Sequence, residues 1–446
     1  MIKAGMNVAR LNFSHGTHDD HKKTAGLIRS EALKYNSPVA LLQDIKGLKI
    51  RVGPIKGGAV LIEKGDALTI TNKKITGDDK QIQIAYPRLM KDLKAGNTIL
   101  IDDGLIQLKV IRKEKDRLTA RVIEGGVLKE RKGVNFPGVD VTASTFTRKD
   151  MDDLALGIEL GVDYIALSFV RTKSDILKVK RWLKKNGSDT PLIAKIENRR
   201  AIENIDGIIE TADGLMIARG DLGVEVPPEE VPMIQKRLIE KCNIALKPVI
   251  TATQMLESMT EHTRPTRAEA ADVANAVIDG TDALMLSGET AAGRFPVEAV
   301  EMMDRIISYT EEHKIEQGPA NVIAKDFAQA IAEAACSSAV DIKAKTIAAF
   351  TKSGFTALLV SKFRPPVPIT GFTSEENIRR RMNLYWGITP HIMKFPHDTD
   401  EMIAESEKVL IRKNIVKKGD TIVIIATSPF TLGGKTNILK LHKAGV

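Results

Sequence analysis

The chain has few of the features that mark secreted or membrane proteins. Only two of its 446 residues are cysteines, and both Cys242 and Cys336 fall in helix-like segments. This argues against a disulfide framework and favours a reducing, cytoplasmic setting. No apolar stretch is long enough to span a membrane, and the first residues lack the apolar core of a signal peptide. We therefore expect no membrane partner.

Aromatic residues are also scarce, at 4% of the chain, which predicts a mostly aliphatic core. The net charge of +9 allows two interpretations, a nucleic-acid partner or a general attraction for anionic metabolites. The second is favoured because the basic residues are dispersed among acidic ones, so we expect no nucleic-acid partner. A chain of this length predicts two or three domains.

Seven apolar runs have the length and composition of buried strands, and amphipathic helix-like segments separate them. The runs are 8–13, 39–43, 164–169, 192–196, 214–218, 248–253 and 283–286. This alternation predicts an α/β fold built on a (β/α)8 TIM barrel, which needs eight strands. Residues 1–5 resemble the end of a helix closed by Gly5. We therefore expect the first barrel strand and most of its helix to be missing, so that the chain is N-terminally shortened.

Two further regions depart from the barrel pattern. Residues 52–137 contain short alternating runs separated by glycine, lysine and aspartate turns, which predict an inserted all-β lid domain. The runs, each a predicted strand, are 67–71, 81–84, 98–101, 105–111 and 118–122. The barrel then comprises 1–51 and 138–315, followed by a linker at 315–320. Residues 321–446 predict an open-sheet C-terminal α/β domain, with helices at 324–339 and 355–362 and strands at 346–351, 368–372, 388–393, 421–426 and 436–441.

Polar side chains recur at the carboxyl ends of the predicted barrel strands, where barrel enzymes collect their catalytic groups. These residues are Arg10, Asn12, Ser14, Asp44, Lys46, Ser168, Lys195, Glu197, Arg219, Asp221, Thr253, Ser287 and Glu289. The period of two places Lys195 and Glu197 on one face of their strand. A structural ion pair at the barrel rim would explain any single pair of charged residues, such as Lys195 and Glu197. It does not explain why polar residues recur at every strand end.

Glu197 and Asp221 follow neighbouring strands, and two such carboxylates suit Mg²⁺ or Mn²⁺. No His/Cys spacing typical of zinc sites occurs, and His15 and His18 favour surface or phosphate contact. Glycine at Gly220 lets backbone amides approach a ligand closely. The set predicts a hard cation and an anionic substrate held together.

Six segments resemble the pyruvate kinase family, in order and with family-like spacing from residue 1 almost to the end. They are MNVARLNFSHG at 6–16, KIEN at 195–198, ARGDLG at 218–223, TQMLESM at 253–259, RPTRAE at 264–269 and MLSGET at 285–290. The resemblance implies phosphoryl transfer from phosphoenolpyruvate to ADP, which gives pyruvate and ATP in the final step of glycolysis. It also implies a homotetramer.

The resemblance further implies a role for each catalytic position. Glu197 and Asp221 would hold the divalent metal, Lys195 would stabilise the phosphoryl group in flight, and Arg10 would contact the phosphate. The backbone amides of Gly220 and Asp221 would bind the substrate carboxylate. Thr253 would lie beside the methylene carbon where the enolate is protonated, and Ser287 would join a proton relay. Nucleotide contacts would come from Asn12, His15, Arg51 and Lys132, the last carried by the lid.

Asn12, Ser14, Asp44 and the carbonyl of Ile45 match the family's ligands for a monovalent cation. Potassium-dependent members usually carry glutamate where this chain has Lys49, so we expect the ammonium group to replace K⁺ and K⁺ dependence to be weak or absent. Two further departures are Leu48, in place of a usual proline, and residues 141–144 at the return from the lid. Asp102 lies in the predicted lid, and an ordinary turn and a lid contact explain it equally well.

In the C-terminal domain, one loop resembles the family's sugar-phosphate effector site. Its residues are Thr351, Lys352, Ser353, Gly354 and Thr356. Hydroxyls, amides and a helix N-terminus there can bind an anion, and a simple helix cap is the equal alternative.

Two other functions remain possible at this stage. The shortened barrel could serve only as a binding or assembly partner, with exposed strand edges. The chain could also be another enzyme on a phosphoenolpyruvate-binding barrel, such as a lyase, although Arg51, Lys132 and the lid argue against it.

Overall fold

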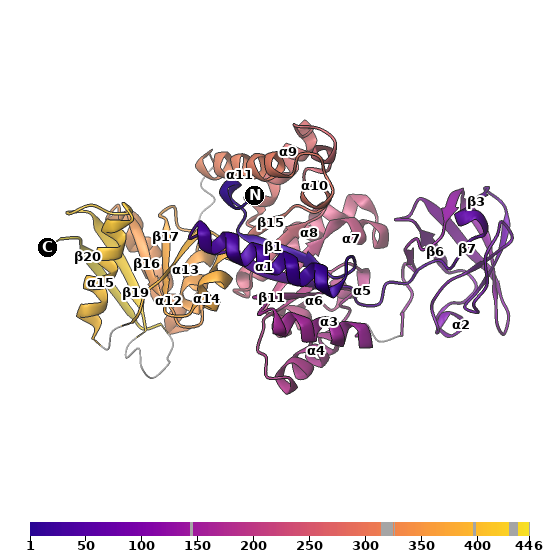
Figure 1. Cartoon of the computed structure of the whole chain (residues 1–446), viewed down its shortest axis with the longest axis horizontal. Coiled ribbons are helices and arrows are strands. Elements are labelled where there is room, and N and C mark those ends of the chain that lie inside the picture. Colours follow the sequence, from indigo (N-terminus) through magenta and orange to yellow (C-terminus); the bar gives the residue numbers. More distant parts are fainter. Residues whose placement is uncertain (143–145, 314–323, 325, 396–397, 428–435, 446) are drawn as a thin grey trace.

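The computed structural model describes residues 1–142, 146–313, 324, 326–395, 398–427 and 436–445. Three bodies follow one another along the long axis of the molecule (Figure 1). A parallel sheet wrapped by helices lies in the middle, a small all-β body lies at one end, and an open sheet with its helices lies at the other. No helix within the described residues is long and apolar enough to cross a membrane.

The middle body contains seven parallel strands, each within two residues of its predicted bounds. In sheet order they are β1 (Val8–Asn12), β2 (Ala40–Ile45), β11 (Tyr164–Leu167), β12 (Leu192–Ile196), β13 (Gly214–Ala218), β14 (Val249–Ala252) and β15 (Ala283–Met285). They form the curled parallel sheet of a (β/α)8 barrel, and β1 and β15 are its edges in the described part of the chain. Before β1, the short 3-10 helix η1 (Ile2–Ala4) ends at Gly5, whose φ is 106°.

Side chains of these strands alternate between two apolar layers, as a period of two requires. In β2, Leu41 packs in the layer beneath the helices, whereas Ala40 and Leu42 pack in the barrel interior. The covering helices are α1 (His18–Lys34), α3 (Arg148–Glu159), α4 (Lys173–Lys185), α5 (Arg199–Glu203), α6 (Ile205–Thr211), α7 (Arg219–Glu225), α8 (Val231–Ile244), α9 (Arg267–Asp279), α10 (Gly288–Ala291) and α11 (Pro296–His313). Capping boxes fix where four of them begin, at Thr17, Thr147, Thr172 and Thr266.

The all-β body is inserted between β2 and α3. One sheet has the order β10 (Val134–Asn135), β6 (Thr98–Ile101), β7 (Ile106–Lys113), β8 (Leu118–Glu124), β4 (Ala67–Thr71) and β5 (Gln81–Gln83). A separate ribbon pairs β3 (Ala59–Ile62) with β9 (Gly126–Lys129), and the short helix α2 (Leu89–Asp92) follows β5. The sequence predicted five of these strands and missed β3, β9 and β10. Apart from Tyr86 and Phe136 its buried core is aliphatic, as the composition predicted.

The C-terminal body has a five-stranded sheet in the order β18 (Ile388–Ile392), β17 (Ile369–Thr373), β16 (Thr346–Phe350), β19 (Thr421–Ala426) and β20 (Ile438–Lys443), with β20 antiparallel. Its helices are α12 (Phe327–Asp341), α13 (Phe355–Lys362), α14 (Glu376–Arg381) and α15 (Thr399–Arg412). The start predicted for the first helix, at 324, was wrong. The helix begins at Phe327 because the Asp326 side chain accepts a hydrogen bond from the Gln329 N–H and caps it. The predicted linker at 315–320 lies outside the described residues.

The base of the barrel is organised by aspartates that stand immediately before β11, β13 and β15. Each carboxylate accepts a 2.8 Å hydrogen bond from a backbone N–H near the start of the neighbouring strand. The pairs are Asp163 with Leu41, Asp213 with Leu192, and Asp282 with Val249. The oxygens of the same three carboxylates also form ion pairs with lysine and arginine side chains. Lys180 of α4 pairs with Asp213, and Lys362 and Arg364 of the C-terminal body pair with Asp282. Asp163 pairs with Arg29 of α1 and with Arg380 of the C-terminal body.

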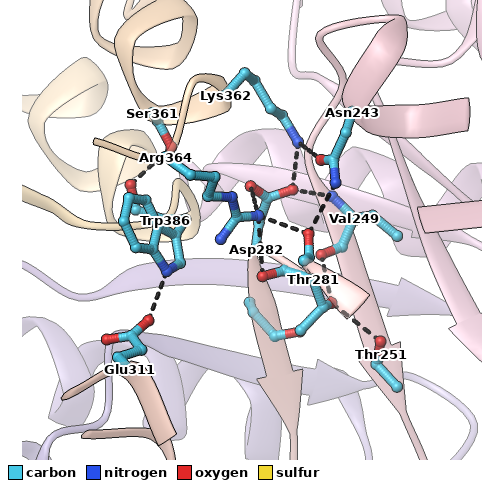
Figure 2. A network of polar contacts seen from close by, with 12 residues as sticks. Asn243, Val249, Thr251, Thr281, Asp282, Glu311, Ser361, Lys362, Arg364 and Trp386 are labelled. Carbon is cyan, nitrogen blue, oxygen red and sulfur yellow. Dashed lines mark hydrogen bonds and ion pairs between the residues drawn. The ribbon is translucent and has the colours of Figure 1, made fainter. Parts of the chain in front are cut away.

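Figure 2 shows the attachment at Asp282. Lys362, the last residue of α13, lies 2.6 Å from Asp282 and also donates to the Asn243 side chain at 2.8 Å. Arg364 donates to the same Asp282 carboxylate at 3.1 Å and stacks 4.7 Å from the ring centre of Trp386. Both Lys362 and Asp282 have fully buried side chains. The C-terminal body is therefore anchored at the end of the barrel opposite to the carboxyl ends of the strands.

Candidate active site

The carboxyl ends of β1, β2 and β12 meet in a chain of ion pairs. Arg10 donates to one oxygen of Asp44 at 2.7 Å, and Lys195 approaches the other oxygen at 3.3 Å. Ser168, just after β11, donates to Asp44 at 3.2 Å and accepts from Lys195 at 2.9 Å. Burial alone would raise the pKa of Asp44, but Lys195 and Arg10 hold it below its ordinary value. Asp44 is therefore an anion that fixes the positions of two cations.

Lys195 has a second carboxylate partner on its own strand. Its ammonium lies 2.8 Å from Glu197, and the two side chains share a face, as the spacing predicted. Burial alone would lower the pKa of Lys195, but Asp44 and Glu197 together raise it. The ammonium group is therefore charged at neutral pH and available to a negatively charged ligand.

Glu197 and Asp221 form the candidate divalent-metal site. The Glu197 carboxylate is almost fully buried and accepts a 2.6 Å hydrogen bond from the Phe169 N–H. Burial raises its pKa, and the nearby Asp221 raises it further. Two carboxylates that repel each other in this way suit Mg²⁺, which usually takes one or two protein carboxylates. Among the described residues, no group of three or more His, Cys, Asp or Glu side chains could hold a metal ion.

The segment after β14 has a strained backbone beside this site. Thr253 has a φ of 69° and Gln254 a φ of 53°, in the left-handed region that a β-branched residue rarely enters. Thr253 Oγ1 accepts a 2.8 Å hydrogen bond from the Gly220 N–H at the start of α7. The predicted amide donor at Gly220 is thus already engaged by Thr253, and the two groups lie side by side.

Ser287 lies just after β15, where Glu289 organises the backbone. One oxygen of the buried Glu289 carboxylate accepts from the Ser287 N–H at 2.7 Å, and the other accepts from the Leu256 N–H at 3.1 Å. The Ser287 Oγ is buried and has no hydrogen-bond partner among the residues that the structure describes. A buried hydroxyl without a partner is open to a ligand or a water molecule.

The predicted monovalent-cation ligands lie together at the ends of β1 and β2, but several are occupied. Asn12 Oδ1 accepts a hydrogen bond from the Ser14 N–H at 3.1 Å. Both oxygens of Asp44 face cations, and Ile45 is the last residue of β2. The Lys49 ammonium lies 3.8 Å from Asp221, which belongs to the candidate divalent-metal site.

Of the predicted nucleotide residues, Arg51 and Lys132 lie where the chain enters and leaves the all-β body, whereas Asn12 and His15 lie at and just after the end of β1. Arg51 donates to the carbonyl of Arg131 at 2.7 Å, Lys132 pairs with Asp102 at 2.8 Å, and His15 is exposed. Within the described chain, no hydrogen bond or ion pair joins these three to Lys195. Asp102 has a φ of 55° in a left-handed turn, and its pairing with Lys132 adds a contact inside the lid.

A cavity of about 500 Å³ separates the lid from the barrel, and Lys49 and Asp221 are among its lining residues. Asn135 of the lid donates to Glu225 of α7 at 2.8 Å across one side of this cavity. At the return from the lid, Arg171 donates to the Val141 carbonyl. Residues 143 and 144, part of the predicted departure from the family, lie outside the described residues.

The loop that resembles an effector site lies in the C-terminal body, after β16, and is not part of the barrel site. Thr351 Oγ1 accepts from the Gly354 N–H at 2.9 Å, and the buried Thr356 hydroxyl pairs with Thr436. Lys352 and Ser353 are exposed. The loop therefore combines an internal cap with exposed polar groups.

Two supporting residues had no predicted role. The Phe169 N–H fixes Glu197, and Phe169 itself has a φ of 55°. Arg219 donates to backbone carbonyls of the strained segment at Thr253. Its position just after β13 placed Arg219 among the polar residues predicted at the strand ends. Nothing in the sequence indicated which residues it would contact.

Comparison with known proteins gives a consistent result over the whole chain. The model of the pyruvate kinase barrel domain matches residues 1–300, and that of the pyruvate kinase alpha/beta domain matches residues 329–442. A pyruvate kinase of Sporosarcina psychrophila is 45% identical over 452 aligned positions, which cover 100% of this chain and 77% of the relative. One from Geobacillus stearothermophilus is 46% identical, with 99% and 76% covered. The crystal structure of a pyruvate kinase from Cryptosporidium parvum superposes with a TM-score of 0.94 at 37% identity, covering 99% of this chain and 92% of that one.

Proposed function

Since the chain belongs to the pyruvate kinase family, we propose a role in phosphoryl transfer from phosphoenolpyruvate to ADP for each residue of the site. The observation that carries this assignment is the buried Lys195 between Asp44 and Glu197, with Asp221 beside Glu197. A cation among fixed anions can meet a migrating phosphoryl group without reorganising.

Lys195 and Arg10 act on the phosphoryl group. Asp44 orients both cations, and Lys195 retains its proton because two carboxylates raise its pKa. Arg10, whose side chain is 22% exposed, can reach a ligand while it stays paired with Asp44. The two cations neutralise charge that spreads over the phosphoryl oxygens as the bond to the enol oxygen breaks.

The remaining substrate contacts come from the ends of β13, β14 and β15. The Gly220 and Asp221 amides face the substrate carboxylate, which competes with Thr253 Oγ1 for the Gly220 N–H. The Thr253 side chain then lies beside the methylene carbon that accepts a proton. The Ser287 hydroxyl relays that proton through water.

Glu197 and Asp221 would hold Mg²⁺, or Mn²⁺ in its place, and pyruvate kinases generally need Mg²⁺ and K⁺. The divalent ion supplies Lewis-acid stabilisation of substrate and phosphate oxygens. The two carboxylates fit this ion because their mutual repulsion needs a cation between them.

Lys49 replaces K⁺ in this chain. Its ammonium already places positive charge 3.8 Å from Asp221, and the predicted K⁺ ligand Asp44 is fully paired. K⁺ is then not required, although Asn12, Ser14 and the Ile45 carbonyl retain the family's donor types.

Arg51, Lys132, His15 and Asn12 bind ADP when the lid closes over the barrel. Burial lowers the pKa of Lys46, and Arg51 and Lys49 lower it further, which indicates a region of positive potential at the base of the lid. Such a region attracts the phosphates of a nucleotide.

The loop from Thr351 to Thr356 binds a sugar phosphate through Lys352 and Ser353, and the chain assembles as a homotetramer. Sedimentation equilibrium and phosphate competition at this loop test the two statements separately.

The metal assignment is tested by Mn²⁺ binding, followed by electron paramagnetic resonance. We expect Glu197→Gln and Asp221→Asn each to weaken Mn²⁺ binding by about 10- to 100-fold, as loss of a ligand or its support typically does. Asp206→Asn, which removes an exposed carboxylate of the same barrel, is the matched control. Unchanged Mn²⁺ affinity in both site variants would show that the metal lies elsewhere.

A further inference from the structure

The strained turn at Thr253 and Gln254 needs a restraint, and one side chain supplies it. Arg219, the first residue of α7, donates to the Thr253 carbonyl from Nε at 3.3 Å and from Nη2 at 2.8 Å. The same Nη2 donates to the Gln254 carbonyl at 3.0 Å. Positive φ at two successive residues turns both carbonyls toward one guanidinium group.

The guanidinium group is itself held in place. Asp272 of α9 accepts from Nη1 through both carboxylate oxygens, at 2.8 and 2.7 Å. The Arg219 side chain is only 9% exposed, and its Nη1 also lies 3.4 Å from Gln235. A planar guanidinium fixed on two sides imposes a defined orientation, which a lysine could not do.

This restraint acts next to the reacting groups. The residue after Arg219 is Gly220, whose N–H donates to Thr253 Oγ1 at 2.8 Å. One short segment of chain therefore fixes both the backbone and the hydroxyl of Thr253. Relaxation of Thr253 to an ordinary negative φ would rotate its side chain away from Gly220.

We propose that Arg219, oriented by Asp272, is a positioning residue that maintains the strained conformation of Thr253 required for protonation of the enolate. The proposal rests on the role proposed above for Thr253. An alternative role is purely structural, in which Arg219 only fastens α9 to the barrel. The two differ in whether the effect of Arg219 passes through Thr253.

The test compares Arg219→Met, Arg219→Lys and Asp272→Asn with Thr253→Ala and the double variant R219M/T253A. Misplacement of a reacting group by about 1 Å can cost roughly 100-fold in rate, so we expect about this loss of kcat in R219M, with KM for ADP nearly unchanged. D272N should lose less, about fivefold to tenfold, because both carbonyl bonds remain. R219K should not restore kcat, because a lysine ammonium lacks the fork geometry.

The decisive measurement is whether the kcat losses of R219M and T253A multiply in the double variant. If Arg219 acts through Thr253, the double variant will be no slower than T253A alone. Exchange of the pyruvate methyl protons in D2O, which reports enolate protonation without phosphoryl transfer, should fall in parallel with kcat. Independent multiplication of the two losses would overturn the proposal.

Folding and the role of Thr253 are controlled separately. D272N replaces a carboxylate that is 38% exposed with a neutral amide of the same shape, so it keeps the test valid if R219M fails to fold. Asp206→Asn, an 81% exposed carboxylate, should keep full activity. If T253A retains its kcat and methyl exchange, the role proposed for Thr253 is wrong. If T253A loses both while D272N and R219M do not, the inference about Arg219 is wrong.

Discussion

Asp282 and Lys362 form the fully buried ion pair that attaches the C-terminal body to the barrel, and replacing each partner should have unequal effects. Asp282→Asn leaves the buried Lys362 and Arg364 without their shared anion. Removing one partner of a buried ion pair typically costs about 3 to 5 kcal/mol. Lys362→Met leaves Asp282 bonded to Arg364 and to the Val249 N–H. The loss is then the two bonds from Lys362 to Asp282 and to Asn243, about 1 to 2 kcal/mol in total because Asp282 keeps its other partners.

Urea unfolding read by Trp386 fluorescence measures this difference. Arg364 stacks on the Trp386 ring and Glu311 accepts from its indole N–H, so the indole reports on the attachment itself. The chain has two tryptophans, and a Trp182→Phe background leaves Trp386 as the only indole. For a slope near 2 kcal/mol per M, the midpoint should fall by about 2 M in D282N and by about 0.5 to 1 M in K362M.

The pH dependence of the stability of D282N is a second, independent test. Burial lowers the pKa of Lys362 in the folded protein even with Asp282 present, so its protonated form is disfavoured there. Without Asp282, stability should therefore fall as the pH falls and recover as the pH rises toward the ordinary lysine pKa. Equal midpoint shifts in the two variants, or a D282N shift below about 0.5 M, would refute the reasoning.

Three shorter predictions follow. Lys49→Glu should lower the activity measured without K⁺ by at least about tenfold and create activation by K⁺, because the ammonium near Asp221 is lost. A K⁺ titration with a tetramethylammonium counter-salt measures both effects, and strong activation of the wild type by K⁺ would contradict the prediction. Burial lowers the pKa of His391 to about 4, so the stability that neutral His391 gives above pH 6.5 should be lost between pH 6.5 and 4. As the pH falls, the urea midpoint should therefore decrease less steeply in His391→Gln than in the wild type, and identical slopes would contradict this. Asp44→Asn should lower kcat by roughly 100-fold because Arg10 and Lys195 lose their shared orientation, and steady-state kinetics that retain full kcat would contradict it.

Strand positions in the barrel were predictable because each strand is a short, nearly continuous apolar run between polar residues. The missed β3 carries the same signal, an apolar run at Ala59–Ile62 that was not predicted as a strand, whereas β9 has only Val127 and Leu128 as apolar residues. The missed β10 is only two residues long. Capping boxes mark the starts of four barrel helices, and the start of α12 at Phe327 shows that one capping aspartate can outweigh hydrophobic periodicity.

The sequence placed the predicted polar residues at one end of the barrel, because parallel strands bring their carboxyl ends together. It could not specify which charges pair. Lys195 contacts Asp44, Ser168 and Glu197 at once, and only tertiary structure brings the first two to it. The strained φ of Thr253 and its restraint by Arg219 and Asp272 also depend on segments that are distant in sequence.

Lys195, set among Asp44, Glu197 and Asp221, is the proposed centre of phosphoryl transfer in this chain. Pyruvate formation from phosphoenolpyruvate and ADP, with Mg²⁺ present, tests it most directly when wild type and Lys195→Met are compared. We predict ADP- and Mg²⁺-dependent turnover in the wild type and a loss of at least about 1,000-fold in kcat in the variant, with Mn²⁺ binding retained. A variant within tenfold of the wild-type kcat would contradict the account.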